Sequence, residues 1–152
     1  MATDRATAPG SKTPDPSSGV FFLVDVGEAI GYFTECTGLG MEYDVVEYQE
    51  GGVNDFVHKL RGRMKFPNLV LKRGITHEES FTKWFLACRE KTERRDLSVT
   101  MLGHDLKPIR TWSFSGAFPV KWSGPELKAQ AGGVAVETIE IAHQGLKSVA
   151  TG

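Results

Sequence analysis

The sequence predicts a mainly β domain of the α+β class, with one helix that lies across a sheet and one long arm. Most of its apolar residues occur in short runs that end near Gly or Pro, which is typical of strands joined by turns. Only the stretch after residue 76 has apolar residues at the helical spacing. The segment 49–67 follows neither period, and this indicates an extended connection that docks on another surface.

The predicted helix has one apolar face, made by residues at positions i, i+3, i+4 and i+7: Phe81, Trp84, Phe85 and Cys88. Thr76 is followed three residues later by Glu79, which is the pattern of a capping box, so we expect the helix to begin after Thr76. Burial of a large apolar side chain contributes about 1.5–3 kcal/mol. The apolar face should therefore pack on the sheet.

The first strand is predicted over Val20–Val26, where both faces are apolar. A strand of this kind is covered on both faces. It lies either between another sheet and the helix, or with one face against a neighbouring subunit. A turn is expected at Gly27–Gly31, and Gly38-Leu39-Gly40 predicts a corner where the backbone bends. Three more strands are predicted before the helix, over Tyr32–Thr37, Met41–Tyr48 and Leu69–Leu71.

Four strand candidates follow the helix, over Leu97–Met101, Ile109–Phe114, Ala117–Trp122 and Val134–His143. Pro119 indicates either an edge strand or a bulge, because proline cannot donate a hydrogen bond to a neighbouring strand. In the last candidate the apolar positions change phase between Val136 and Ile139. This change predicts a bulge near Thr138.

The arm separates its charges along the chain. Acidic residues come first and basic residues follow: Glu42, Asp44, Glu47, Glu50 and Asp55, then Lys59, Arg61, Arg63 and Lys65. Two interpretations stay open from the residues alone. The charges pair across the strands of a solvated hairpin, or opposite ends of identical copies meet head to tail.

Composition limits the classes of protein and partner. A chain of 152 residues is expected to form a single domain. Its net charge of −1 gives no general attraction to nucleic acid or anionic lipid. No apolar run approaches the ~20 residues of a membrane-spanning helix. The N-terminus lacks the pattern of a signal peptide, so we expect synthesis in the cytoplasm.

The sequence predicts no enzyme, catalytic residue, cofactor or metal site. His77-Glu78 begins like a zinc-binding helix, but Phe81 stands where the second histidine is needed. Cys36 and Cys88 are interpreted as small buried hydrophobic residues, although a disulfide stays open. The aromatic residues of the C-terminal half are interpreted as core rather than as a platform for nucleic-acid bases: Trp112, Phe114 and Trp122.

Four blocks in a fixed order carry a resemblance to a known family: CTGLGMEYDVVEYQEGG, KLRGRMKFPNLVLKRGIT, KWSGPELKA and VAVETIEIAHQGL. The sequence resembles the tube proteins of contractile phage tails and of extracellular contractile injection systems. The resemblance covers nearly all of Val20–Val149. The related tube component of type VI secretion shares the same plan.

The resemblance implies a β-barrel-like domain of two packed antiparallel sheets with one flanking helix and an extended hairpin arm. Such subunits form six-membered rings whose sheets join edge to edge around a lumen. The rings stack into a rigid hollow tube inside a contractile sheath, and sheath contraction drives the tube through a target envelope. The implied partners are other copies of the chain, the sheath protein, baseplate and tube-cap components, and possible cargo in the lumen.

The resemblance also implies limits and contacts within this chain. The tail-tube domain would span 20–149, followed by a C-terminal tail at 150–152. Residues 1–19 match nothing in the family, and their small and polar composition predicts a flexible N-terminal arm. The segment Glu42–Lys65 corresponds to the extended hairpin and loop that reach adjacent subunits. The expected ring and stacking contacts are Tyr48, Glu50, Asn54, Asp55, Phe56, Lys59, Arg61 and Arg63. Two alternatives use the same fold, namely a tube-initiator ring at the baseplate and a ring that binds cargo or an effector.

Overall fold

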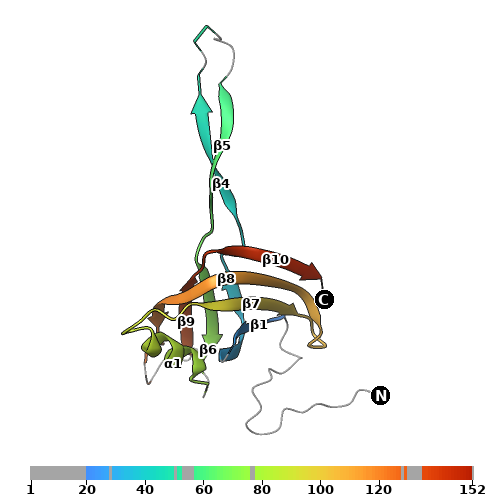
Figure 1. Ribbon diagram of the computed structural model, residues 1–152. Helices are drawn as coiled ribbons and strands as arrows, with labels where there is room; N and C mark the ends of the chain where they lie inside the picture. The colour runs from blue at the N-terminus through green and yellow to red at the C-terminus, as the bar shows by residue number, and fades with distance from the viewer. Residues whose placement is uncertain are drawn as a thin grey trace.

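A computed structural model describes residues 20–27, 29–49, 51–52, 57–75, 78–127, 129 and 135–151. Eight strands of the described chain form the body: β1 (Phe21–Val26), β2 (Ala29–Phe33), β3 (Glu35–Thr37), β6 (Leu69–Gly74), β7 (Arg95–Leu102), β8 (Pro108–Ser123), β9 (Val136–Ala142) and β10 (Gly145–Thr151). A hairpin of β4 (Glu42–Tyr48) and β5 (His58–Lys65) projects from it, and the helix α1 (Ser80–Ala87) flanks it (Figure 1). The predicted mainly β class with one flanking helix is confirmed.

The long strand β8 divides the body into two layers. Its first half pairs with β7 and β10, and its second half pairs with β9. The strand order is β2-β1-β7-β8-β9-β6-β3, with β10 on the first half of β8. The register shifts between Pro119 and Lys121, which confirms a bulge at this proline. The two strands predicted on either side of residue 116 are thus one strand.

The two layers do not close into a hydrogen-bonded barrel within the described chain. β2 and β3 stand at the two ends of the strand order and are not paired with each other. The chain crosses between the layers at Thr34, whose N–H and hydroxyl both bond to the carbonyl of Lys72, at 2.9 and 3.1 Å. The expected barrel-like domain is therefore an open one.

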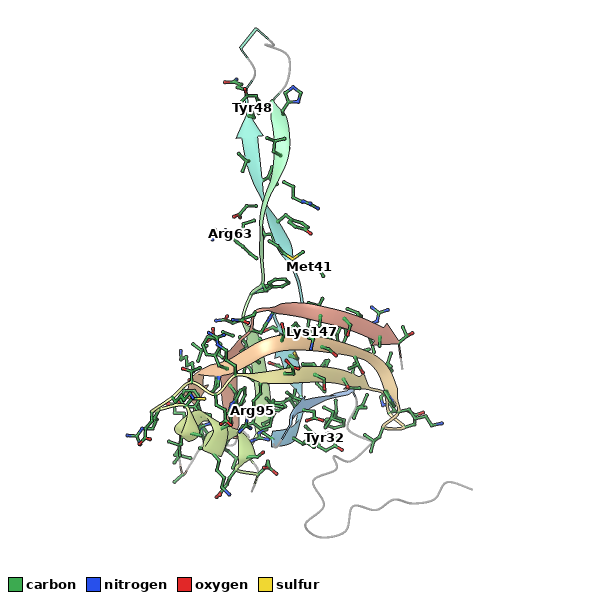
Figure 2. All side chains as sticks on the ribbon, viewed as in Figure 1. Tyr32, Met41, Tyr48, Arg63, Arg95 and Lys147 are labelled. Atoms are coloured by element: carbon green, nitrogen blue, oxygen red, sulfur yellow. The ribbon has the colours of Figure 1, made fainter. Side chains whose placement is uncertain are left out.

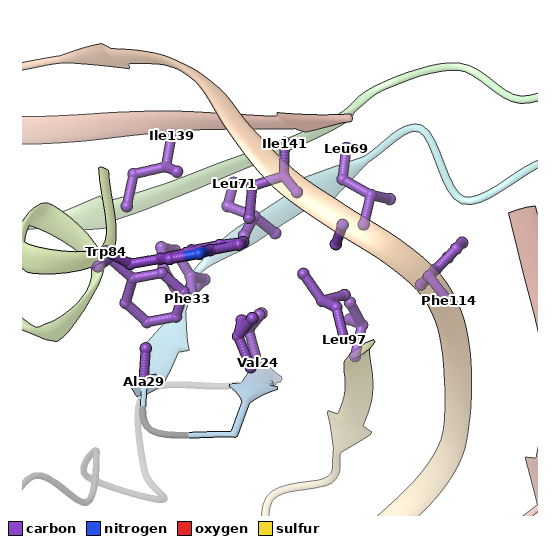
Figure 3. Close-up of a cluster of buried hydrophobic side chains, with 14 residues drawn as sticks. Val24, Ala29, Phe33, Leu69, Leu71, Trp84, Leu97, Phe114, Ile139 and Ile141 are labelled. Carbon is purple, nitrogen blue, oxygen red and sulfur yellow. The ribbon is translucent and has the colours of Figure 1, made fainter. Parts of the chain in front are cut away.

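The core lies between the layers and under the helix (Figure 3). Val24 and Val99 come from one layer and Leu71 from the other, and all three are fully buried. The helix adds Phe81 and Trp84, which confirms its predicted apolar face. The indole N–H of Trp84 donates to the carbonyl of residue 93 at 3.1 Å, so this buried polar group is satisfied.

The helix begins later than the sequence predicts. Its first residue is Ser80, whose N–H donates to the carboxylate of Glu78 at 2.8 Å, and its N-cap is Glu79. A cap at Thr76 is therefore wrong, and Thr76 itself lies outside the described residues. A carboxylate two positions before Ser80 takes the role expected of the threonine hydroxyl, because it reaches the same end of the helix.

The predicted bulge in β9 is also wrong. β9 pairs with β6 in an unbroken register, from Leu69 opposite Ile141 to Gly74 opposite Val136. Its core-facing residues are Glu137, Ile139 and Ile141, while Val136 is exposed. The apolar phase changes in the sequence because a carboxylate occupies a core-facing position, and the backbone stays regular.

Glu137 is held in the core by an ion pair. Its carboxylate lies 3.2 Å from Nε of Arg73 on β6, and both side chains are buried. The guanidinium of Arg73 stacks over Phe33 at 4.9 Å and over Phe81 at 5.4 Å. The other oxygen of Glu137 accepts the indole N–H of Trp122. A buried charge needs such partners, so this network joins β2, β6, β8, β9 and α1.

The last strand was missed in the sequence. β10 pairs antiparallel with β8 along its whole length, and the residues after Leu146 are exposed. It lacks the alternation of apolar and polar residues that signals a half-buried strand. It ends at Thr151, so the sheet continues past residue 149. The turn expected at Gly27–Gly31 is shorter, since β2 begins at Ala29.

The corner predicted at Gly38 depends on this glycine. Its φ is 92°, and a Cβ there would overlap the carbonyl oxygen of Asn68. The left-handed conformation alone costs an alanine about 1–2 kcal/mol. We expect Gly38→Ala to lower the unfolding free energy by more than this amount in urea titrations. Gly40→Ala is the control, because a Cβ there meets no atom within 4 Å. Equal stability of the two variants would contradict the prediction.

Candidate functional site

The hairpin of β4 and β5, here called the arm, is the most exposed element of the described chain (Figure 2). Its two strands pair with each other and do not join the eight-stranded sheet. A two-stranded hairpin alone is at best marginally stable in water. The arm is therefore a surface that gains stability when another surface covers it.

The outer half of the arm has two chemically different faces. Residues directly opposite each other in a hairpin share a face, and successive residues alternate. The apolar arm face consists of two cross-strand pairs: Val46 with Leu60, and Tyr48 with His58. The charged arm face consists of Glu47 with Lys59, and Val45 with Arg61. Val46, Leu60 and Tyr48 are 52%, 53% and 53% exposed, so the apolar arm face lies open to solvent.

Two opposite charges pair at the root of the arm. Lys65 Nζ lies 2.7 Å from the carboxylate of Asp44. The hydrogen bond and the charge of Asp44 raise the pKa of Lys65. Arg61 stacks over the ring of Tyr43 at 4.8 Å. The described part of the chain holds no ion pair for Lys59 or Arg63, so these two cations are available to a partner.

A histidine packs where the arm joins the body. The ring of His143 lies 4.5 Å from that of Phe114 and 5.6 Å from that of Phe66, which follows β5. Its Nδ1 accepts the N–H of Gly145 at 3.1 Å. Burial lowers the pKa of His143. The neutral imidazole therefore links the arm root to the junction of β9 and β10.

Four of the eight predicted contact residues lie in the described chain. Tyr48 is on the apolar arm face near the tip (Figure 2). Lys59 and Arg61 are on the charged face. Arg63 follows on β5. The structure brings these side chains onto one hairpin but not onto one face. The other four lie outside the described residues: Glu50, Asn54, Asp55 and Phe56.

The predicted contact residues did not include Val46 and Leu60, although Leu60 is one of the apolar residues that indicated a docking arm. Val46 and Tyr48 are two residues apart on one strand, and His58 and Leu60 are two residues apart on the other. Residues with this spacing share one face of a strand. That signal was present, but it was hidden because the segment after residue 49 was interpreted as aperiodic. The pairing of the two strands reveals the shared face.

The body offers a second surface, which is its open sheet edges. In the described chain, β2 and β10 end the layer β2-β1-β7-β8-β10, and neither has a partner on its outer side. Val24, Val99, Trp112 and Val149 lie in one row across this layer. Val24 and Val99 are fully buried, whereas Val149 is 49% exposed. Exposed edges of this kind promote association unless they are paired.

The described residues hold no group of three or more His, Cys, Asp or Glu side chains that could bind a metal. Cys36 and Cys88 are free thiols, so the disulfide left open by the sequence is not formed. Burial raises the pKa of Cys36 to about 12, which keeps its thiol protonated and unreactive. None of the described helical segments is long and apolar enough to span a membrane.

A comparison of the sequence with models of known protein families identifies the family of this chain. Residues 19–147 match the family described as T4-like virus tail tube protein gp19. The chain belongs to this tail tube family. The resemblance found in the sequence blocks is therefore confirmed, and the family is one of structural tube proteins. No curated protein matches the sequence at a significant level.

Solved structures share the fold of this tail tube protein. A chain in the baseplate of the anti-feeding prophage is 26% identical with a TM-score of 0.73, and the match covers 91% of this chain and 97% of that one. A chain in the PVC sheath-tube complex, an extracellular contractile injection system, is 24% identical with a TM-score of 0.74, over 86% and 88%. Hcp1 from Flavobacterium johnsoniae is 16% identical with a TM-score of 0.53, over 87% and 96%.

Proposed function

We propose that this chain is the repeating subunit of the inner tube of a contractile injection system or contractile phage tail. Six copies form a ring, and the rings stack into a rigid hollow conduit. Sheath contraction drives this conduit through the target envelope. The subunit performs no catalysis, and its function is mechanical.

The observation that carries the proposal is a sheet layer that, among the described strands, has an unpaired edge on both sides. β10 ends one side of this layer and β2 ends the other, so the two edges are different surfaces of one chain. Contacts between unlike surfaces form a ring when the rotation closes. All neighbours in the layer are antiparallel, so β10 and β2 run in the same direction. A ring formed by rotation would thus pair β10 of one copy with β2 of the next in parallel.

The proposed partners follow from the same family. Other copies of the chain are the first partner, and each specific contact should bury more than ~1,000 Å². Similar chains occur in structures of a baseplate, a sheath-tube complex and a tube-terminating cap. We infer that this chain meets a sheath protein outside the tube and baseplate and cap components at its ends. The lumen is then available to cargo.

A second candidate is a tube-initiator ring at the baseplate. The baseplate chain of the anti-feeding prophage, at 26% identity, favours it. An initiator is present in one or a few rings, whereas the main tube protein is present in many. Quantitative mass spectrometry of purified particles separates the two by the ratio of this chain to the sheath protein.

Electron microscopy of the purified full chain tests the proposal. We expect six-fold rings or hollow tubes in negative stain, and a large assembly in size exclusion. A monomer at every concentration, with no tubes even after addition of baseplate components, would refute it.

Reversal of two arm charges should block tube formation. We expect the variant Arg61→Asp with Arg63→Asp to give no tubes, because both cations lie on the exposed strand β5. Its circular dichroism and melting temperature should stay near those of the wild type, since these side chains are outside the core. The control is Arg89→Asp with Lys91→Asp, which reverses the same number of positive charges in the segment that follows α1. Normal tubes from the arm variant would refute its stacking role.

A further inference from the structure

The direction of the arm depends on the segments of chain that join it to the body. After β5 the chain passes through Phe66 and Pro67 and enters β6 (Figure 1). β4 and β5 pair only with each other, so no sheet hydrogen bond fixes the arm to the body. The side chain of Phe66 is half-buried, whereas Pro67 is exposed. Phe66 is therefore the apolar side chain that anchors this segment.

Two residues at the junction of β9 and β10 contact the Phe66 ring. The ring of His143 lies 5.6 Å from it. Gly145 packs so closely that a Cβ at this position would lie 3.3 Å from the ring, and its φ is 149°. Only glycine adopts such a conformation readily. The same imidazole lies 4.5 Å from the ring of Phe114, a residue of the buried core. His143 thus connects Phe66 to the core.

The hydrogen bonds of His143 require a neutral ring. Its Nδ1 accepts the N–H of Gly145 at 3.1 Å, so the neutral ring carries its proton on Nε2. Nε2 is buried and makes no hydrogen bond within the described chain. A second proton would enter at Nδ1, where it would face the N–H of Gly145. Because two donors cannot bond to each other, protonation breaks the contact with Gly145.

The surroundings of the imidazole favour its neutral form. Burial lowers the pKa of His143, and the carbonyl of Pro67 opposes this effect to a smaller extent. The faces of the two phenylalanine rings attract a cation only weakly when it is partly exposed. The contacts of the neutral ring are therefore complete above the ordinary imidazole pKa of about 6.5. They are lost as the pH falls through the lower pKa of the folded chain.

Charged side chains on the elements around His143 have partners of their own. Each of three groups on β9, β10 and β5 is held by a neighbour: Glu140 by Asn68 at 3.0 Å, Lys147 by Asp96 at 3.3 Å, and Lys65 by Asp44 at 2.7 Å. The pKa of His143 responds to burial and to the carbonyl of Pro67, and to none of these charges. The imidazole is thus the group that changes charge at this junction.

We propose that His143 is a pH-dependent latch for the arm. The neutral ring holds Phe66 and Gly145 against the core. The protonated ring gives up the bond to Gly145 and releases Phe66, so the arm becomes mobile in acid. The body stays folded, because the N–H of Gln144 still donates to the carbonyl of Ser115 at 2.8 Å. These contacts lie within one chain, so the inference does not depend on the proposed tube function.

Two spin labels, one on the arm and one on the body, measure this release. The full chain carries Leu60→Cys and Ile109→Cys, both at exposed positions, with Cys36→Ala and Cys88→Ala. It is diluted into a large excess of unlabelled chain, so that only distances within one copy are seen. Double electron–electron resonance gives the distance distribution at about pH 8 and about pH 5, the range in which an imidazole changes its charge. We expect one narrow peak at the higher pH and loss of that peak at the lower pH.

Two further variants show whether His143 is the group that responds. His143→Phe keeps an aromatic ring between Phe66 and Phe114 but cannot take up a proton, so its distribution should be the same at both pH values. His104→Phe is the matched control, because His104 is exposed in the turn between β7 and β8. This variant should respond as the wild type does. A narrow wild-type peak at both pH values would overturn the inference, and so would a response that persists in His143→Phe.

Circular dichroism and electron microscopy of the same samples separate the latch from other causes. The far-ultraviolet spectrum should be the same at both pH values, and its loss together with the peak would assign the change to unfolding and refute the latch. Normal tubes with a narrow peak at both pH values refute the latch and leave the tube function standing. Loss of the peak in a chain that forms no tubes at either pH supports the latch and counts against the tube function.

Discussion

Replacing Arg73 with Met is expected to lower the unfolding free energy by about 3–5 kcal/mol, because it leaves a buried carboxylate without its charge partner. Arg73 lies 3.2 Å from Glu137, and its guanidinium stacks on Phe33 and Phe81. Methionine fills a similar volume and keeps the apolar contacts with these rings. The loss is therefore electrostatic, and urea titration followed by circular dichroism measures it.

The double variant Arg73→Met with Glu137→Met isolates this cause. It removes both charges, so we expect its stability to lie close to that of the wild type or above it by up to about 4 kcal/mol. The indole N–H of Trp122 loses its acceptor in this variant, but the partly exposed ring can reach water. If the double variant is as unstable as the sum of the two single variants, the ion pair does not explain the burial of Glu137.

Removal of the arm is expected to abolish tube formation while the body still folds. Residues 44–63 are replaced by Asn-Gly, which joins the paired residues Tyr43 and Met64 through a tight turn. The arm strands pair only with each other, so the core keeps all of its side chains. Negative-stain microscopy and size exclusion follow assembly, and thermal melting checks the fold.

The arm deletion also separates the two proposed contacts. Ring closure uses the edges of β2 and β10, which the deletion leaves intact. We therefore expect single rings without stacks. A deletion variant that forms tubes of normal length would show that stacking does not need the arm. Loss of rings as well as stacks would indicate that the arm contacts neighbours within one ring.

Several elements could be predicted from local pattern. The apolar face of α1, the strands β1, β4, β6 and β7, and the corner at Gly38 follow from the spacing of neighbouring residues. The bulge at Pro119 follows from the missing N–H of proline. β10 could not be predicted, because its exposed residues carry no alternation and it exists through its pairing with β8.

The contact role of the arm stays a prediction. The segregation of charge along the arm left both a solvated hairpin and a contact between copies open, and the resemblance carried by the four sequence blocks favoured the contact. The sequence favoured the charged residues Lys59, Arg61 and Arg63. The predicted contacts left out Val46 and Leu60, because only the cross-strand register shows that these two residues share one face.

The sequence by itself determined the kind of structure at each segment, since helix and strand periods are local properties of the chain. Only the tertiary structure decided what each face meets. Glu137 belongs to the core because Arg73, 64 residues earlier in the chain, lies opposite it on the paired strand. The indole N–H of Trp122 reaches the same carboxylate, while 44% of the residue stays exposed. The prediction that Trp122 is a core residue is therefore wrong. These placements depend on long-range pairing, and the spacing of residues along one segment carries no information about the partner strand.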